Sequence, residues 1–460
     1  MVVVVVLVVL VAVALVVAAH WYVWRRLVRD TARKGGVARR AGTVAAFVLP
    51  VLAVSASGAG RSGAPFWVQR LVAWPGYLWL AVLMYLLLAL LVGEAVRPLL
   101  RRYVDGRARG ADGEGGAQAA ARAEGDVQAR TETQTSEPVG QPVAAPAGPG
   151  GSGGSGGTAD SAGSAGAASS QTGTVLTGRA PSAAPVPSRR LFVSRVVAGA
   201  AATAAAATVG YGTYGVLRGP RVKRITVPLA KLPRAAHGYR IAVVSDIHLG
   251  PILGRAHTQR IVDTINSTRP DLVAVVGDLV DGTVKDLGPA AVPLAGLEAP
   301  HGAFFVTGNH EYFSGAQEWV DHVRELGLRP LVNERVEIAG FDLAGVNDIA
   351  GESEGDGPDF AKALGDRDRA RASVLLAHQP IVIHDAVRHG VDLQLSGHTH
   401  GGQLWPGNYL AELANPTVAG LERYGDTQLY VTRGAGAWGP PVRVGAPSDI
   451  TVVELASRQA

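Results

Sequence analysis

The chain of 460 residues contains no cysteine. This absence excludes disulfides, a thiol nucleophile, a cysteine-ligated zinc site and an iron–sulfur cluster. Any metal site must therefore use histidine, carboxylate, amide or water ligands. A strong excess of one charge is also lacking, because 43 Lys and Arg residues against 38 Asp and Glu residues leave a net charge of +5. No dense basic patch with interleaved aromatic residues occurs, so nucleic-acid binding is not expected.

Asp, Glu, Lys and Arg are missing from three long stretches near the N-terminus. The first, residues 2–24, is apolar except for His20 and is long enough to cross the ~30 Å hydrocarbon core of a bilayer as a helix. Residues 41–57 and 74–92 have the same character. We therefore expect residues 1–104 to form a membrane anchor with three transmembrane helices. A cleaved signal peptide is the rival interpretation of the first stretch, but here the positive charges follow the apolar run instead of preceding it.

The basic residues around these stretches predict the orientation of the anchor. Seven lie between the first two stretches and five follow the third, whereas only Arg61 and Arg70 lie between the second and the third. Basic loops remain on the cytoplasmic side of a membrane. The N-terminus and the loop that carries Arg61 are therefore expected outside, and the chain is expected inside after the third stretch.

Two segments of unusual composition follow the anchor. Residues 105–187 are mainly Gly, Ala, Ser, Pro and Thr, and this composition predicts a disordered linker. Residues 188–218 begin with Ser188, Arg189 and Arg190 and continue as a weakly apolar segment. The paired arginines resemble a twin-arginine export signal, and an ordinary fourth transmembrane helix is the alternative. Both interpretations predict a multi-pass protein of the cell membrane with its remaining chain on the extracytoplasmic side.

The last segment, residues 219–460, has the pattern of a globular α/β domain. Apolar runs alternate with helix-like segments, which predicts helices layered on a sheet. The predicted buried strands are 239–245, 271–276, 303–307, 373–377 and 391–395, and the predicted amphipathic helices are 258–266 and 316–326. Two late strands, 428–432 and 450–455, follow one another without a convincing helix, so part of the sheet is expected to be antiparallel or mixed.

Polar residues stand where the predicted strands end. They are Asp246 and His248, Asp278 and Asp281, Asn309 and His310, His378, and finally His398 and His400. Ligands of open α/β sheets bind at the carboxyl ends of the strands, so these side chains are expected to share one rim. Mixed oxygen and imidazole ligands suit Mn, Fe or Zn.

Each of these short patterns alone has an ordinary structural explanation. Asp278 could cap a helix or a turn, Asn309 could be a turn residue, and His378 could be a strand-end histidine with a satisfied hydrogen bond. The sequence GHTHGG at 397–402 is more specific, because two histidines between glycines at a strand end serve no packing purpose. The five patterns together, in this order, favour a metal site.

The order D-x-H, G-D-x-x-D-G, G-N-H-E, H and G-H-T-H resembles the calcineurin-like metallophosphoesterase superfamily over residues 240–455. GHTHGGQ at 397–403 and RGAG at 433–436 resemble its bacterial membrane-associated branch, which includes twin-arginine-exported members. The resemblance implies a four-layer α/β/β/α sandwich with a two-metal centre. It also implies a hydrolase in which a metal-activated hydroxide attacks a phosphomono- or diester.

The resemblance further implies a role for each polar residue at the strand ends. Asp246, His248 and His400 would hold the first metal, and Asn309, His378 and His398 would hold the second. Asp278 would bridge both ions. His310 would protonate the leaving oxygen, and Asp281 would orient His310. Glu311 could support the site or begin a helix.

One departure bears on the substrate. Protein phosphatases of the superfamily carry Arg where this chain has Gly282, so a phosphoprotein substrate is not expected. Arg433 and Arg443 could contact phosphate instead, or could be structural. Trp405 and Trp438 could form a substrate wall or lie at the lipid interface. The predicted tether near the bilayer favours a lipid or cell-envelope phosphate.

Two alternatives come from other functional classes. The domain could be a membrane sensor that binds metal or a phosphorylated ligand without turnover, although the complete ligand set favours an enzyme. A transporter built from the N-terminal spans is a further possibility. Those spans lack Asp, Glu and Lys at their centres, where a transport pathway would need them.

Overall fold

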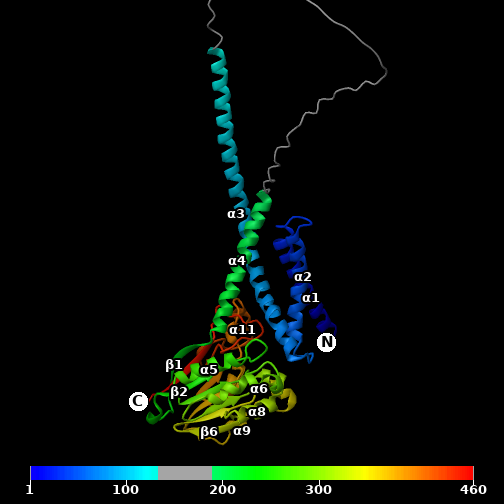
Figure 1. Cartoon of the computed structure of the whole chain (residues 1–460). Coiled ribbons are helices and arrows are strands. Elements are labelled where there is room, and N and C mark those ends of the chain that lie inside the picture. The colour runs from blue at the N-terminus through cyan, green and yellow to red at the C-terminus, as the bar shows by residue number, and fades with distance from the viewer. Residues whose placement is uncertain (1, 133–188, 459–460) are drawn as a thin grey trace, which may run out of the picture. The chain divides into compact units, whose positions relative to one another are not determined.

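The computed structural model describes residues 2–132 and 189–458 (Figure 1). Residues Met1–Val96 and Ser194–Ala460 form one compact unit, and Arg97–Val193 form another. Most of the predicted linker, residues 133–187, lies outside the described residues, together with Ser188. Its first part, residues 105–132, is helical, because the third long helix continues to Glu132.

Within the part of the chain that the structure describes, four helices are long and apolar enough to cross a membrane. They are α1 (Val2–Trp24), α2 (Val37–Gly58), α3 (Phe66–Glu132) and α4 (Arg189–Leu217). Each contains one of the predicted apolar stretches. Residues Arg189–Leu217 therefore form a helix of membrane-spanning length.

The helices of the first unit are joined by specific contacts. Arg26, just after α1, forms an ion pair with Glu94 of α3 at 3.0 Å. Nε of Arg195 in α4 donates to the carbonyl of Thr31 at 3.1 Å. Ala201 and Ala205 of α4 belong to one apolar cluster with Ala81, Leu86 and Leu90 of α3. The segment that carries Arg26 and Thr31, the region of α4 at Arg195 and the region of α3 at Glu94 thus lie together.

Twelve strands form two six-stranded sheets in the segment after α4. The first sheet has the order β1 (Arg221–Leu229), β12 (Asp449–Ser457), β2 (Tyr239–Val244), β3 (Leu272–Val276), β4 (Ala303–Val306), β5 (Arg329–Pro330). The second has the order β10 (Gly420–Tyr424), β11 (Thr427–Val431), β9 (Leu393–Ser396), β8 (Ala372–Leu376), β7 (Phe341–Gly345), β6 (Glu334–Ile338). Both sheets are mixed: β12 is antiparallel to β2, and β6 is antiparallel to β7, whereas β2, β3 and β4 are parallel and so are β7, β8 and β9.

Alternating side chains of each strand enter different layers of the core. Ile241 and Val243 of β2 lie in the cluster between the sheets, which also contains Val374 and Leu376 of β8. Ala242 and Val244 face the other way, toward a cluster with α5 and α8. This period of two is expected for strands buried on both faces.

Helices cover the outer face of each sheet and complete the four predicted layers. The first sheet is covered by α5 (Arg255–Ser267), α6 (Val284–Ala291) and α8 (Ala316–Glu325), and the second by α9 (Phe360–Leu364) and α10 (Ile383–Arg388) (Figure 1). Two further helices are α7 (Asn309–Ser314) and α11 (Gly407–Ala414). The loops that follow β2, β3, β4, β8 and β9 carry the polar residues predicted at the strand ends.

Candidate metal centre

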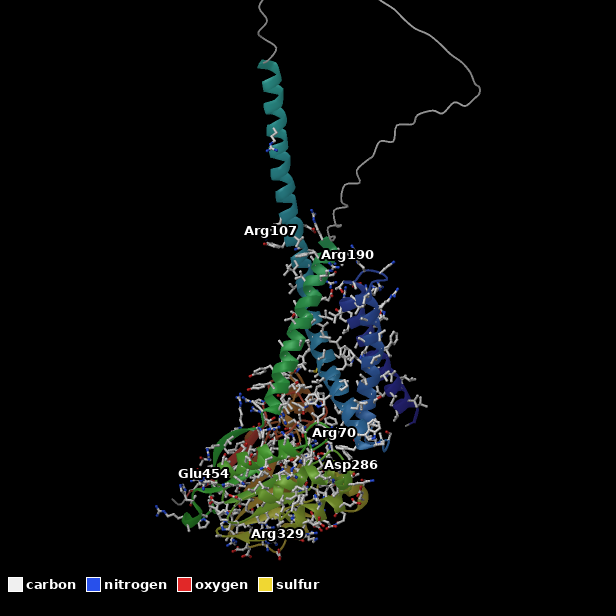
Figure 2. The ribbon with its side chains drawn as sticks, in the orientation of Figure 1. Arg70, Arg107, Arg190, Asp286, Arg329 and Glu454 are labelled. Atoms are coloured by element: carbon white, nitrogen blue, oxygen red, sulfur yellow. The ribbon has the colours of Figure 1, made fainter. Side chains whose placement is uncertain are left out.

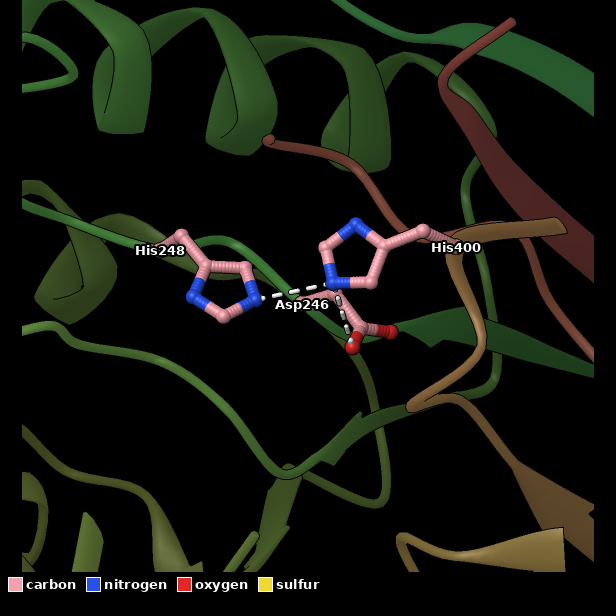
Figure 3. A group of neighbouring side chains, drawn as sticks. All are labelled: Asp246, His248 and His400. Carbon is pink, nitrogen blue, oxygen red and sulfur yellow. Dashed lines mark hydrogen bonds and ion pairs between the residues drawn. The ribbon is translucent and has the colours of Figure 1, made fainter. Parts of the chain in front are cut away.

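The strand-end residues converge in two adjacent clusters. The first consists of Asp246 and His248, which follow β2, and His400, which follows β9 (Figure 3). Nε2 of His248 lies 3.0 Å from Nε2 of His400, and the latter lies 3.4 Å from Oδ1 of Asp246. All three side chains are buried. One ligand atom from each lies within 4.8 Å of the others, close enough for all three to reach one ion.

The second cluster consists of Asp278, His378 and His398. Nε2 of His378 lies 3.2 Å from Oδ2 of Asp278. Asn309 joins this cluster, because its Oδ1 lies 3.1 Å from Nδ1 of His398. The same Oδ2 of Asp278 lies 3.8 Å from Nε2 of His248 in the first cluster. Asp278 therefore lies between the two groups of ligands, where one carboxylate could contact two ions.

The backbone at these residues is strained in a way that is typical of functional sites. Eight non-glycine residues of the described chain have positive φ, and five of them are Asp246, His248, Asp278, His398 and His400, with φ between 49° and 73°. Left-handed backbone is costly for such residues and persists only where the surroundings enforce it. This backbone conformation orients the five side chains toward the two ligand clusters, as metal ligation requires.

Glycine allows the loops to approach one another closely. Gly277 has φ +73°, and a Cβ there would lie 2.6 Å from Nδ1 of His378 and 2.8 Å from Cα of Gly308. Gly434 has φ +79°, and a Cβ there would lie 2.5 Å from Cβ of Asp246. Larger residues at these two positions would push the ligand loops apart.

Burial and neighbouring charges shift the pKa values of the ligands in both directions. Burial alone would lower the pKa of His248 and of His378, but nearby carboxylates raise that of His248 to about 9 and that of His378 well above its usual value. Burial lowers the pKa of His398 to about 4 and lowers that of His400 well below its usual value, so both imidazoles are neutral, the form that ligates metals. Burial alone would raise the pKa of Asp278, but the imidazoles of His378, His248 and His310 lower it. Burial raises the pKa of Asp246, so a nearby cation would favour its ionised form. The donor set therefore fits divalent metal ions.

His310 and Asp281 lie beside the two clusters. Nδ1 of His310 and Nδ1 of His248 each lie 2.8 Å from Oδ1 of Asp281. Burial alone would raise the pKa of Asp281, but the two imidazoles hold it at about 2. Nε2 of His310 lies 3.9 Å from Oδ2 of Asp278. Asp281 thus orients a ligand and the neighbouring histidine together.

Glu311 stabilises the loops that carry the ligands. The carboxylate of Glu311 accepts hydrogen bonds from the backbone N–H groups of Asp278 (3.0 Å), Leu279 (2.8 Å) and Gly308 (2.6 Å). Glu311 therefore ties the loop after β3 to the start of α7.

Arg443 is buried, at 4% exposure, and donates to the carbonyls of His400 (3.1 Å), Gly436 (2.7 Å) and Ala446 (3.1 Å). Its Nη2 lies 3.1 Å from Nδ1 of His400. Of the two roles considered from the sequence, the structural one holds for Arg443, since its donors are used within the domain. No local sequence pattern indicates this support of His400, because the two residues are far apart along the chain.

Comparisons with known proteins agree with this geometry. Residues 239–402 match the family model of calcineurin-like phosphoesterases. A metallophosphoesterase of Helicobacter pylori is 38% identical over 255 residues, which cover 54% of this chain and 68% of that protein. The chain belongs to the calcineurin-like phosphoesterase family. Membership supports a metal-dependent hydrolase of phosphoester bonds.

Two further relatives of this phosphoesterase differ in how much of their length is matched. A metallophosphoesterase of Aquifex aeolicus is 36% identical over 240 residues, which cover 51% of this chain and 91% of the relative. The zebrafish (Danio rerio) transmembrane protein with metallophosphoesterase domain is 39% identical over 259 residues, which cover 53% of this chain. The match spans 59% of the zebrafish protein's own length.

Proposed function

We propose that the protein is a membrane-anchored phosphoesterase that hydrolyses phosphomono- or diesters with two metal ions, of Mn, Fe or Zn. The observation that carries this proposal is the position of Asp278 between two clusters of ligands, with His310 beside them. Asp246, His248 and His400 would hold one ion, and Asn309, His378 and His398 the other. When bound, such ions polarise phosphoryl oxygens and lower the pKa of an attacking water.

The chain's own residues supply the proton for the leaving group. Asp281 accepts a hydrogen bond from Nδ1 of His310, so the doubly protonated imidazolium form carries a second proton on Nε2, which it gives to the ester oxygen as the bond to phosphorus breaks. Asp281 remains ionised at neutral pH because its pKa is held at about 2. The ring centroids of Trp438 and Phe313 lie 5.8 Å and 5.5 Å from that of His310.

The proposal includes an extracytoplasmic catalytic domain. It is supported by the contacts that bring Arg26 and Arg195 to the same end of the apolar helices. It is also supported by the turn between α2 and α3, which carries few basic residues and lines a pocket of the catalytic domain. The pair Arg189–Arg190 at the start of α4 favours export by a twin-arginine route. The packing of α4 against α3 favours retention of α4 in the chain as a fourth span. An enzyme anchored in this way would act on lipid or cell-envelope phosphates.

Hydrolysis by the purified full-length protein tests the proposal. The protein in detergent is stripped of metal, supplied with Mn²⁺, Fe²⁺ or Zn²⁺, and assayed with bis-nitrophenyl phosphate and with the matching monoester. We expect metal-dependent turnover of at least one of them. Tight metal binding without turnover of either would instead support a non-catalytic sensor of metal or phosphorylated ligands.

A further inference from the structure

A pocket beside His310 is lined by residues of the catalytic domain and by residues of the membrane helices. It has a volume of about 390 Å³, and His248, Asp281 and His310 line it from the domain. Its other lining residues include Arg61, Phe66 and Tyr77, from the turn between α2 and α3 and from α3 itself. Figure 2 labels Asp286, which lines the pocket from α6, and Arg70, which lies one turn beyond Phe66 in α3. The membrane hairpin of α2 and α3 is thus a wall of the candidate active site.

Specific contacts join the two helices of this hairpin to each other and to the domain. Oη of Tyr77 donates to the carbonyl of Ala56 at 3.0 Å, which joins α3 to α2. Oη of Tyr85 donates to the carbonyl of Trp405 at 2.9 Å, which joins α3 to the domain. Phe66 packs against the apolar cluster between the first sheet and its helices. The wall is therefore a packed part of the structure.

The domain presents apolar side chains beside the same pocket. Trp438 and Phe313, whose rings flank His310, are 56% and 72% exposed. Gln403 donates to the carbonyls of Trp438 (2.9 Å) and Pro440 (3.2 Å), and so connects the pocket rim to the loop that precedes α11.

The exposed face of α11 extends this apolar surface. Tyr409, Leu410 and Leu413 of α11 are 58%, 71% and 85% exposed. A short helix with an exposed apolar face, next to membrane helices, is typical of a segment that lies in the lipid interface. The rim of the pocket and α11 would then meet the lipid together.

Arg61 gives the pocket a charge that suits phosphate. Among the described residues that line it, Arg61 is the one Lys or Arg. A guanidinium forms paired hydrogen bonds with phosphate oxygens. The pocket therefore combines a proton donor and a cation with apolar and aromatic walls, a combination that matches an amphipathic phosphoester.

We infer that the substrate is a membrane lipid phosphoester, with its phosphate between His310 and Arg61 and its apolar part along Phe66 and Trp438. This inference rests on the proposed phosphoesterase function. In the reaction a water molecule loses one proton to the solvent and its oxygen forms a bond to phosphorus, while the ester P–O bond breaks. The leaving alcohol takes the proton of His310, and the solvent then returns a proton to His310. No electron is transferred.

The test compares a lipid substrate with a soluble one in the full-length protein. The protein is reconstituted with Mn²⁺ into phosphatidylcholine vesicles that carry phosphatidic acid, a monoester, or phosphatidylglycerol, a diester. Released phosphate and headgroups are measured, in parallel with hydrolysis of bis-nitrophenyl phosphate and the nitrophenyl monoester. We expect Phe66→Ala to lower kcat/KM for the lipid about tenfold more than for the soluble ester, because it removes apolar contact. The matched control is Trp67→Ala, whose side chain is 68% exposed and outside the pocket lining.

Arg61→Gln provides a second variant, in an exposed turn where folding is not at risk. It is expected to raise KM for lipid and soluble phosphoesters, whereas Arg70→Gln, outside the pocket lining, leaves both unchanged. Hydrolysis of a soluble ester without hydrolysis of any lipid would overturn the inference and leave the phosphoesterase standing, as would variants that behave like their controls. If wild-type protein with bound metal hydrolyses neither class, the proposed function itself is wrong.

Discussion

Oδ1 of Asp281 lies 2.8 Å from Nδ1 of His310 and links that histidine to the ligand clusters. The same oxygen lies 2.8 Å from Nδ1 of His248. One carboxylate therefore sets the orientation of a candidate ligand and of the candidate acid. Any change in Asp281 should act through both histidines.

We expect His310→Ala to lower kcat by about 10²-fold or more while metal remains bound, because it removes the proton donor and no ligand. Asp281→Asn should lower kcat less, by about 10–100-fold, because His310 is present but less well oriented. Steady-state kinetics at saturating Mn²⁺, with bound metal measured on the same samples, would check both. The control is His384→Ala, an exposed histidine of α10. Full activity of His310→Ala would show that another group is the acid.

Removal of the metal should destabilise the domain. Asp246 and Asp278 are 0% and 2% exposed, and without a cation the two buried carboxylates are offset only by neighbouring histidines and by local hydrogen-bond donors such as the N–H groups of His310 and His398. We expect chelation to lower Tm by about 5–10 °C and added Mn²⁺ to restore it. His378→Ala should reduce the bound metal from two ions to one. Equal metal content in His378→Ala and wild type would contradict the ligand assignment.

Replacement of Arg443 should weaken metal binding without touching substrate. Arg443→Met leaves the carbonyl groups of His400, Gly436 and Ala446 without this donor. We expect metal affinity to fall about 10–100-fold, because His400 is no longer held in place. Isothermal titration with Mn²⁺ measures the change, and Arg433→Gln, at a partly exposed neighbouring site, is the control. A raised KM with unchanged metal affinity would instead identify Arg443 as a phosphate contact.

Stability at acidic pH should depend on His257 in α5. Burial, assisted by the charges of Arg260 and Arg443, lowers its pKa from 6.5 to about 4. Because the unfolded chain then binds the proton more tightly, the contribution of His257 to stability is complete above pH 6.5 and is lost as pH falls toward 4.

This lowered pKa predicts that the free energy of unfolding is about 2 kcal/mol smaller at pH 5 than at pH 7. Urea unfolding in detergent at both values measures it. In His257→Leu this part of the pH dependence should disappear, whereas His384→Leu should retain it. The same pH dependence in His257→Leu and wild type would contradict the assignment.

The absence of cysteine makes the orientation directly measurable. Ser62→Cys lies in the exposed turn between α2 and α3, and Ala38→Cys lies near the start of α2. We expect a membrane-impermeant maleimide to label Ser62→Cys in intact cells and Ala38→Cys only after permeabilisation. The reverse pattern would put the catalytic domain inside the cell.

The buried strands and the long helices were predictable because their signals are local. β2, β3, β4 and β8 are mainly apolar, β9 contains Gln394 and Ser396, and the structure has each of the five within two residues of the prediction. The edge strands β1, β5, β6 and β10 and the internal strand β7 were not predicted. β10, with the sequence GLERY, is largely exposed, and its strand conformation depends on pairing with β11 more than on its own composition.

In the candidate site, too, the features with local sequence signals were predictable and those that depend on tertiary contacts were not. The residue types and their order at the strand ends are local, so the histidines and carboxylates could be listed before their distances were known. Support of the site by Glu311 and a structural role for Arg443 were among the options from the sequence. Their partners were not predictable, because they depend on hydrogen bonds between separate loops.

The sequence by itself determined the apolar spans, the alternation of strands and helices, and the identity of the polar residues, since each of these depends on neighbours along the chain. The family resemblance implied a bridging position for Asp278, but only the tertiary structure provided the distances that place it between two ligand clusters and showed that Arg61 shares a pocket with His310. The physical reason is that these relationships arise from packing between segments as many as 249 residues apart, and no periodicity or short motif encodes such a distance.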